Sequence, residues 1–401
     1  MSGERWNNSS MTSNASSPAR ARIAAAKRIV VKIGSSSLTR ANGRLDIAAL
    51  RRFVDVLAER HAEGVEIVLV TSGAVAAGLG PLDLPSRPKD LATVQAAASV
   101  GQGLLIGQYA DAFAAYGIPV GQLLLTTEDT VRRSRYRNVW RTVDRILALG
   151  GVPIINENDA LVADGRGFGD NDRIAALTAH LVRAEGLLLL TDVNGLYDGP
   201  PSQEGTKRIP EVENLADIAH VEIGGSGSSV GTGGMVTKLR AAEIAVESGT
   251  PVILTTAASA REALRGEDVG TCFAAKDKRP SRRQLWLAHA AKTDGKIHVD
   301  EGAARAVASG RASLLAAGVT AIDDNLNASD PVSIVDPEGK EIARGLVAFD
   351  SSHVREMIGK STDEIANELG EDYGRAVVHL DDLVLVGRSR GNPGPLDDLE
   401  Q

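Results

Sequence analysis

Several short segments of polar or glycine residues follow apolar runs in this sequence, and they contain the side chains that could do chemistry. Lys32 stands near the end of the apolar run 28–33, just before a Gly-Ser-Ser-Ser turn at 34–37. A lysine in this place can offer its charge to phosphate oxygens, and the amides of the turn can add donors. Taken alone, such a lysine is more often a long side chain that reaches water from a strand end. Lys32 therefore points to phosphate only together with the other segments.

A second segment suited to an anion is the glycine-rich stretch 224–234, which runs into an expected helix carrying Lys238. Glycines let backbone amides approach an anion, and the N-terminus of a helix favours negative charge. Neither the Walker A spacing nor a G-x-G-x-x-G loop after a first strand is present. A flexible surface linker is the alternative for this composition, and the helix directly after the segment argues against it.

A cluster of acidic and amide side chains forms the third feature. Gly169-Asp170-Asn171-Asp172 opens an expected helix, and it follows the polar segment Asn156-Glu157-Asn158-Asp159. Any one of these residues could be a plain helix N-cap. Three in a row are harder to explain by capping, so the cluster could bind a metal, order the lysines, or hold the amine and carboxylate of a substrate.

Ser72 and Gly73 follow another apolar run and could offer a hydroxyl and amides to a carboxylate, although alone they indicate a simple turn. The G-x-S-x-G elbow is absent, which disfavours a hydrolase nucleophile. The seven histidines show no metal-ligand spacing and Cys272 is the only cysteine, so zinc and Cys–His catalysis are disfavoured.

A carboxylate that accepts a phosphoryl group is already ionised at neutral pH and needs no general base. Lysines, amides and carboxylates therefore suffice for making an acyl phosphate.

The elements that position these segments alternate between apolar strands and helices. We expect strands at 28–33, 66–70, 120–125, 152–155, 187–190 and 252–254, with helices at 46–63, 91–115, 132–149, 174–183 and 235–248. This alternation predicts an α/β fold, a mostly parallel sheet sandwiched by helices. Ligands bind beyond the carboxyl ends of the strands in such sheets. Four polar segments stand directly after expected strands: Gly34-Ser35-Ser36, Thr71-Ser72-Gly73, Asn156-Glu157-Asn158-Asp159 and Thr191-Asp192.

The pattern changes near residue 276, which predicts a second, small β-rich domain. Its expected strands are 296–299, 331–335 and 341–347, with a hairpin turn at Asp336-Pro337-Glu338-Gly339. The predicted organisation is a disordered extension at 1–26, a catalytic domain at 27–275, a linker at 276–292, the β-rich domain at 293–382 and a loose tail at 383–401.

Composition limits the class of partner. The chain has 401 residues and a net charge of −8, which argues against a protein that binds polyanions with its whole surface. With one cysteine no intrachain disulfide can form, which fits a reducing, cytoplasmic location. No apolar stretch reaches the length of a membrane span, and the N-terminus lacks the apolar core of a secretory signal.

The motifs together resemble a known family. They are Val31-Lys32-Ile33-Gly34-Ser35-Ser36, Val70-Thr71-Ser72-Gly73-Ala74, Ile155-Asn156-Glu157-Asn158-Asp159, Gly169-Asp170-Asn171-Asp172, Leu190-Thr191-Asp192 and Gly231-Thr232-Gly233-Gly234-Met235-Val236-Thr237-Lys238. In this order the chain resembles the bacterial glutamate 5-kinases, of the amino-acid kinase fold with a C-terminal PUA domain. The resemblance covers residues 27–382, and the last motif is the most specific within the fold.

This resemblance implies a role for each matching residue. Lys32, Asp172 and Lys238 are implied to be catalytic: the lysines contact the phosphates of ATP and the transferring phosphoryl group, and Asp172 orders them. The glutamate-binding residues are implied to be Ser72, Gly73, Asp159 and Asn171. The implied ATP-binding residues are Lys32, Gly34, Thr191, Asp192, Thr232, Gly233, Gly234, Met235, Val236, Thr237 and Lys238.

The resemblance also implies the ligands and the product. Magnesium is expected to arrive bound to the phosphates of ATP, with no side chain as its direct ligand. The implied product is L-glutamyl 5-phosphate, the first intermediate of proline biosynthesis, and the implied properties include feedback inhibition by proline and a homodimer or homotetramer. One departure concerns the acceptor: Gly167, beside Arg166, stands where relatives commonly carry a basic residue.

Two alternatives remain at this point. One is another kinase of the same fold, acting on acetylglutamate, aspartate, carbamate or a nucleotide, which the C-terminal domain and the 231–238 motif disfavour. The other is an RNA-binding regulator, because PUA folds in other proteins bind RNA. The acidic balance and the lack of an aromatic stacking platform disfavour RNA. The presence of Lys32, Asp172 and Lys238 together also favours an enzyme.

Overall fold

The computed structural model of the protein describes residues 17–126, 129, 133–161, 171–200, 203, 205–218, 234–275, 284, 287 and 293–386. Within these residues the first domain is built on an eight-stranded sheet with the order β3-β4-β2-β1-β5-β7-β8-β6. Its strands are β1 (Arg28–Ile33), β2 (Glu66–Val70), β3 (Val120–Leu125), β4 (Val152–Glu157), β5 (Gly186–Thr191), β6 (Glu211–Val212), β7 (Val252–Thr256) and β8 (Thr271–Phe273).

The sheet is mostly parallel, as the alternation of strands and helices predicted. All neighbouring strands from β3 to β7 in the sheet order run parallel, and only the β7–β8 pair is antiparallel. In the central strand β1, Val30 packs into the core on one face, while Ile29 and Val31 pack into the core on the other. This explains why β1 reads as a continuous apolar run, since a strand covered on both faces buries every side chain.

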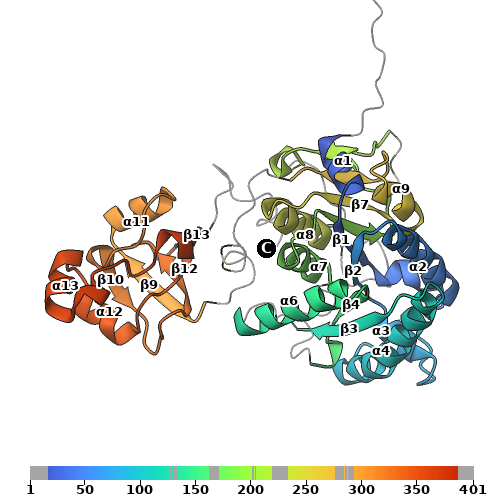
Figure 1. Ribbon diagram of the computed structural model, residues 1–401, viewed down its shortest axis with the longest axis horizontal. Helices are drawn as coiled ribbons and strands as arrows, with labels where there is room; N and C mark the ends of the chain where they lie inside the picture. Colours follow the sequence, from blue (N-terminus) through green and yellow to red (C-terminus); the bar gives the residue numbers. More distant parts are fainter. Residues whose placement is uncertain are drawn as a thin grey trace, which may run out of the picture.

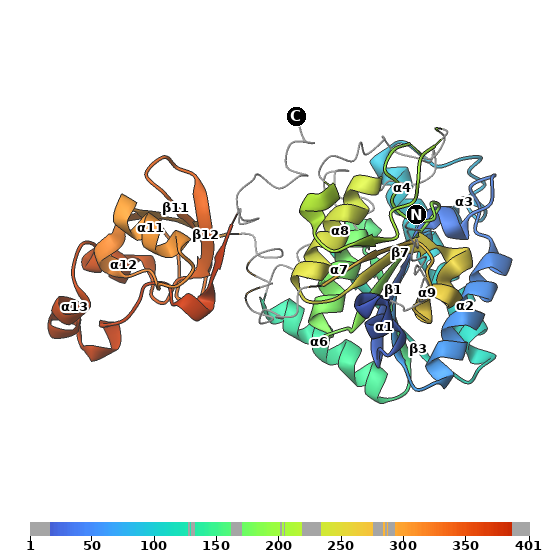
Figure 2. The same cartoon turned by 90° about the horizontal axis from the view of Figure 1, so that it is seen from above.

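Helices cover both faces of this sheet (Figures 1 and 2). One layer contains α6 (Arg133–Ala148), α7 (Asn171–Leu181) and α8 (Met235–Glu247). The other contains α1 (Pro18–Ala24), α2 (Ile47–Ala62), α3 (Ala74–Leu79), α4 (Leu91–Ala114) and α9 (Ala260–Leu264). The expected helices agree with the observed ones to within three residues at each end, whereas α1, α3, α9, β6 and β8 were not predicted.

The prediction of a disordered extension over residues 1–26 is wrong for residues 17–26. Ser17 caps α1 by accepting a hydrogen bond from the Arg20 amide at 3.3 Å, and Pro18 occupies the first turn. Ile23 is fully buried against the sheet. Polar composition pointed to disorder, but a capped helix with one apolar anchor forms because the domain gives that anchor a place to pack. Residues 1–16 lie outside the described part.

Two glycines of the α3–α4 pair allow the helix that follows Ser72 and Gly73 to pack closely. A Cβ placed on Gly101 of α4 lies 1.8 Å from the Ala74 carbonyl oxygen, and one on Gly78 lies 2.0 Å from the Ala97 carbonyl oxygen. These approaches exclude any side chain unless the helices separate.

We therefore expect Gly101→Ala to lower the free energy of unfolding by about 1–3 kcal/mol, since it overpacks the contact. The matched control is Gly103→Ala in the same helix, where an added Cβ meets nothing within 4 Å. That variant should gain up to about 1 kcal/mol from helix propensity. Urea unfolding measures both, and equal midpoints for the two variants would contradict the close-packing argument.

The C-terminal domain has its own sheet, with the order β10-β9-β11-β12-β13, and its own apolar core. Its elements are β9 (Gly295–Val299), α11 (Glu301–Ala308), β10 (Val319–Ile322), β11 (Pro331–Val335), β12 (Glu341–Leu346), α12 (Ser351–Met357), α13 (Thr362–Leu369) and β13 (Leu383–Leu385). The predicted hairpin turn after Val335 joins the antiparallel pair β11–β12, and Gly339 there has φ 81°.

The prediction that the loose tail begins at residue 383 is wrong for its first three residues. Residues 383–385 form β13, which pairs antiparallel with β12. Three residues give too short an apolar pattern to be recognised without the neighbouring strand. Residues 387–401 lie outside the described part, as does most of the predicted linker 276–292. No helix among the residues that the structure describes is both long and apolar enough to cross a membrane.

Candidate functional site

Three charged side chains from three different elements meet at the carboxyl edge of the first sheet. Lys32 comes from β1, Asp172 from the first turn of α7 and Lys238 from the first turn of α8. Lys32 Nζ lies 2.7 Å from Asp172 Oδ1, and Lys238 Nζ lies 3.3 Å from Asp172 Oδ2. All three are buried, with exposed fractions of 5%, 1% and 8%. The predicted catalytic residues thus form one ion triad, with Asp172 between the two lysines.

The charge balance of this ion triad suits a site for an anion. Two ammonium groups and one carboxylate leave a net charge of +1 in a buried place. Burial alone would raise the pKa of the Asp172 carboxyl, but the Lys32 and Lys238 ammonium groups and the Thr237 hydroxyl hold that pKa below its ordinary value. Asp172 therefore stays ionised and stabilises the fold at neutral pH. Its contribution is lost only as the pH falls through this lowered pKa.

Backbone donors flank the ion triad. Gly234 is the N-cap of α8, and it has no side chain that could cap the amides of the first turn. The Thr237 hydroxyl lies 3.1 Å from Asp172 Oδ2 and 2.9 Å from the Gly234 carbonyl oxygen, which ties this turn to the triad. Free amides at a helix N-terminus bind phosphate readily. Of the remaining predicted ATP residues, Met235 and Val236 open α8, while Thr232 and Gly233 lie outside the described residues.

Gly34 belongs to the same edge. Its amide donates to the Leu190 carbonyl oxygen at 3.2 Å, so the turn after β1 lies against the end of β5. A Cβ at this position would stand 3.7 Å from Lys32 Nζ, in the space beside the ammonium group. At the end of β5, Thr191 Oγ1 donates to Asp192 Oδ1 at 2.9 Å. Gly34, Thr191 and Asp192, which were predicted to bind ATP, therefore lie at the same edge of the sheet as Lys32.

The predicted acceptor residues form a second, polar cluster beside the triad. Asn171 precedes Asp172 at the start of α7, and its Nδ2 donates to Ser72 Oγ at 3.1 Å. The same Nδ2 donates to Asn156 Oδ1 at 3.1 Å, and Asn156 Nδ2 donates to Gln102 Oε1 at 2.7 Å. Asn171 is 5% exposed and Asn156 is 1% exposed. This chain from α4 through β4 to α7 fixes Ser72 and Asn171 beside the triad.

Gln102 and Asn156 were not predicted as site residues, and the reason differs between them. Asn156 lies inside one of the motifs, but its role in orienting Asn171 is not visible in a linear segment. Gln102 stands in the middle of the Ala-rich helix α4, 54 residues from Asn156, and no local pattern marks it. Only the packing of α4 beside β4 brings it to the cluster.

Gly73 and Asp159 complete the acceptor side. Gly73 has φ 107° and ψ 8° as the N-cap of α3, a left-handed conformation that favours glycine. Asp159 opens a short 3-10 turn after β4 and is partly buried. Burial raises the pKa of the Asp159 carboxyl to about 6, and the nearby Arg87 guanidinium opposes this rise. Gly169, Asp170 and the departure at Arg166 and Gly167 lie outside the described residues.

The arrangement can hold a polyanion at the lysines and a small polar acceptor next to them. Among the described residues no group of three or more His, Cys, Asp or Glu side chains could hold a metal ion.

Comparison with known proteins identifies the family of this chain. The amino acid kinase family matches residues 27–256, and the PUA domain matches residues 295–369. Glutamate 5-kinase of Streptomyces avermitilis is 55% identical over 372 residues, which are 92% of this chain and 99% of that protein. Glutamate 5-kinase of Streptomyces coelicolor is 54% identical over 369 residues, with the same two shares.

A third relative and one solved structure complete the comparison. Glutamate 5-kinase of Thermobifida fusca is 53% identical over 369 residues, 92% of this chain and 95% of that protein. The structure of carbamate kinase from Giardia lamblia bound to AMP-PNP aligns with a TM-score of 0.48 and 18% identity, covering 63% of this chain and all of the other. That likeness adds nothing to the assignment. The sequence matches alone establish that this chain belongs to the amino acid kinase family and, within it, to the glutamate 5-kinases.

Proposed function

We propose that this protein transfers the terminal phosphoryl group of ATP to the side-chain carboxylate of L-glutamate, giving L-glutamyl 5-phosphate and ADP. The observation that carries the proposal is the ion triad of Lys32, Asp172 and Lys238 directly beside the Ser72–Asn171 pair. This is the first step of proline biosynthesis, and the relatives named glutamate 5-kinase support it.

The chemistry needs charge stabilisation rather than proton transfer. A carboxylate oxygen of glutamate attacks the γ-phosphorus, a new P–O bond forms, and the bond to the β–γ bridging oxygen of ATP breaks as ADP leaves. Negative charge spreads over the transferring oxygens, and preorganised cations stabilise it. We propose that Lys32 and Lys238 take this role and that Asp172, which contacts both ammonium groups, keeps them in position. ATP is the donor, and we propose that it binds as its magnesium complex.

The direct test traps the product. Purified protein is incubated with glutamate, ATP and magnesium, and hydroxylamine converts any acyl phosphate into a hydroxamate. Aspartate, acetylglutamate and UMP serve as parallel acceptors. We expect hydroxamate with glutamate alone. ADP release only with another acceptor would keep the phosphate site but overturn the proposed substrate.

The pH dependence tests the acceptor side through Asp159. We propose that its carboxylate binds the ammonium group of glutamate. Because its pKa is about 6 in the free protein, protonation removes the charge below that value. We expect kcat/KM for glutamate to fall about tenfold per pH unit below about 6, since kcat/KM reports the free enzyme. The effect of Asp159 on stability has the opposite pH dependence. Between about pH 4 and pH 6 the folded state holds a proton on Asp159 that the unfolded state has lost, so the contribution of Asp159 to the free energy of unfolding falls as the pH rises through this range.

Asp159→Asn is the variant that isolates this effect. It should lower kcat/KM for glutamate at pH 8 and remove the fall below pH 6, whereas KM for ATP should not change with pH in this range in either protein. A wild-type profile that stays flat between pH 5 and pH 7 would contradict the role of Asp159.

The remaining proposals concern regulation and assembly. We propose that the protein acts in the cytoplasm as a homodimer or homotetramer and that proline inhibits it, in keeping with its family resemblance. Native mass spectrometry and proline added to the hydroxamate assay test these points. We do not propose RNA as a partner of the C-terminal domain, because the chain is acidic overall.

A further inference from the structure

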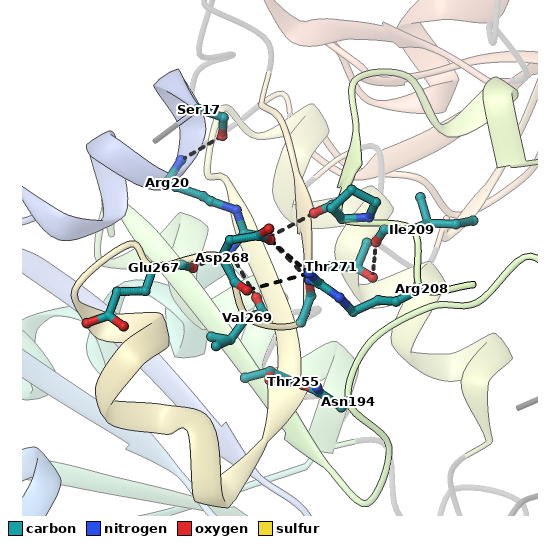
Figure 3. A network of polar contacts seen from close by, with 12 residues as sticks. Ser17, Arg20, Asn194, Arg208, Ile209, Thr255, Glu267, Asp268, Val269 and Thr271 are labelled. Carbon is teal, nitrogen blue, oxygen red and sulfur yellow. Dashed lines mark hydrogen bonds and ion pairs between the residues drawn. The ribbon is translucent and has the colours of Figure 1, made fainter. Parts of the chain in front are cut away.

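The guanidinium group of Arg20 is held deep between two loops of the first domain, and Arg20 is only 4% exposed. It donates to the carbonyl oxygens of Glu267 at 2.6 Å, Val269 at 2.9 Å, Pro210 at 2.9 Å and Gly270 at 3.2 Å (Figure 3). We call this set the arginine clamp. One planar fork therefore joins helix α1 to two segments, 267–270 before β8 and Pro210 before β6.

The carbonyl contacts, rather than charge pairing, give the arginine clamp its strength. Arg20 also lies 3.5 Å from Asp268, but that carboxylate is 70% exposed, so the ion pair contributes little. Hydrogen bonds from a charged donor are worth more than those between neutral groups. Arg208 reinforces the same loop from the other side by donating to the Gly270 carbonyl and to Asp268 Oδ1.

From the arginine clamp the contacts continue toward the predicted ATP edge. Thr271 directly follows Gly270, and its Oγ1 accepts from the Leu196 amide at 2.7 Å and donates to the Ile209 carbonyl oxygen at 2.6 Å. Gly195 has φ 107°, and a Cβ there would lie 2.8 Å from Thr271 Oγ1. The chain after β5 therefore approaches Thr271 at a distance that only glycine permits.

A second fixed point holds the same segment. Thr255 of β7 donates from its Oγ1 to Asn194 Oδ1 at 2.9 Å (Figure 3). The stretch 192–196 is thus tied to β7 at Asn194 and to β8 at Leu196. It begins at Asp192, directly after Thr191, the last residue of β5, and these two residues are the ones that the sequence predicted to bind ATP.

We propose that Arg20 is a positioning residue for the nucleotide, acting through Gly270 and Thr271 on the segment 192–196 that carries the end of the ATP site. The inference rests on the proposed function, because it takes Thr191 and Asp192 as ATP-binding residues. Arg20 touches neither substrate. Its loss releases the loop 267–270, loosens the support of Thr271, and lets the segment after Thr191 move.

The test compares two arginines of the same helix. Arg20→Ala removes the arginine clamp, whereas Arg22→Ala removes a single hydrogen bond to the Gly249 carbonyl, beyond the far end of α8 from the triad. Binding of Mg-AMP-PNP is measured by titration calorimetry, and KM values for ATP and glutamate are measured with the hydroxamate assay. Arg20→Ala should raise the analogue Kd and the KM for ATP by roughly two- to thirtyfold, with KM for glutamate unchanged. Arg22→Ala should bind the analogue as the wild type does.

A second pair of variants covers the case that Arg20→Ala does not fold at the assay temperature. Thr271→Val keeps the shape of the side chain and removes the hydroxyl that holds Leu196 and Ile209, while Thr271→Ser keeps the hydroxyl. The valine variant should weaken analogue binding, and the serine variant should restore most of it. If the substitutions acted only by lowering the melting temperature, analogue binding would weaken without a difference between the valine and serine variants.

Two results would overturn the inference. One is analogue binding by folded Arg20→Ala that matches Arg22→Ala; the other is equal analogue Kd values for the valine and serine variants at position 271. Failure of the proposed function looks different, because the wild-type protein itself would then form no hydroxamate with glutamate.

Discussion

Replacing Lys238 with methionine lowers kcat by about 10²–10³ while leaving the folded protein as stable as the wild type to within about 1 kcal/mol. The loss of rate follows from removing one preorganised cation from the site where charge develops, which typically costs this much. The stability follows from the charge balance of the ion triad. Without Lys238, Asp172 still pairs with Lys32 at 2.7 Å, and the buried net charge falls from +1 to zero.

This combination separates a catalytic lysine from a structural one. Steady-state hydroxamate formation gives kcat, and urea unfolding gives the free energy of unfolding. Lys340→Met in the β11–β12 turn is the matched control, because it removes the same charge from an exposed position. That control should keep wild-type kcat and stability. A Lys238→Met protein that melts normally and turns over at the wild-type rate would refute the role of Lys238.

The sequence was sufficient for the parts of the fold that depend on local patterns. The buried strands around Val30, Val68 and Leu188 are continuous apolar runs, and β1 and β2 were predicted to the residue. Each of these runs ends in a polar segment, and the topology of a parallel sheet brings such ends to one edge. For this reason the ends of the strands that carry Lys32, Ser72 and Asp192 could be placed at one edge before any distance was known, whereas Asn171, which opens a helix, was assigned to the site by the family resemblance.

What could not be predicted depends on contacts between distant segments. Helix α1 is held by Arg20, whose hydrogen-bond partners lie 190 to 250 residues further along the chain. Gln102 reaches Asn156 only through the packing of α4, and β13 exists because β12 offers it a partner. The polarity of single residues carries no information on contacts between distant segments. The polar composition of residues 1–26 therefore suggested disorder, although residues 18–24 form a capped helix.

The positions of the two lysines make Asp172 the residue whose loss should damage the protein most. Asp172→Asn keeps the size of the side chain but removes the carboxylate that contacts both buried ammonium groups, so the charge of the triad rises from +1 to +2. Removing one partner of a buried ion pair typically costs about 3–5 kcal/mol. We expect the free energy of unfolding to fall by about this amount, together with a loss of kcat at least as large as for Lys238→Met.

The double variant Asp172→Asn with Lys238→Met provides the decisive comparison. It returns the buried charge to +1, so it should be more stable than Asp172→Asn alone by at least about 1 kcal/mol, a coupling expected for residues in contact. Its kcat should stay as low as that of the single variants, because neither change restores the charges around the phosphoryl group. Urea unfolding of all four proteins measures the coupling. Additive effects on stability would mean that Asp172 and Lys238 do not act through their mutual charge, and the triad would then be a consequence of packing rather than the device that holds the lysines for catalysis.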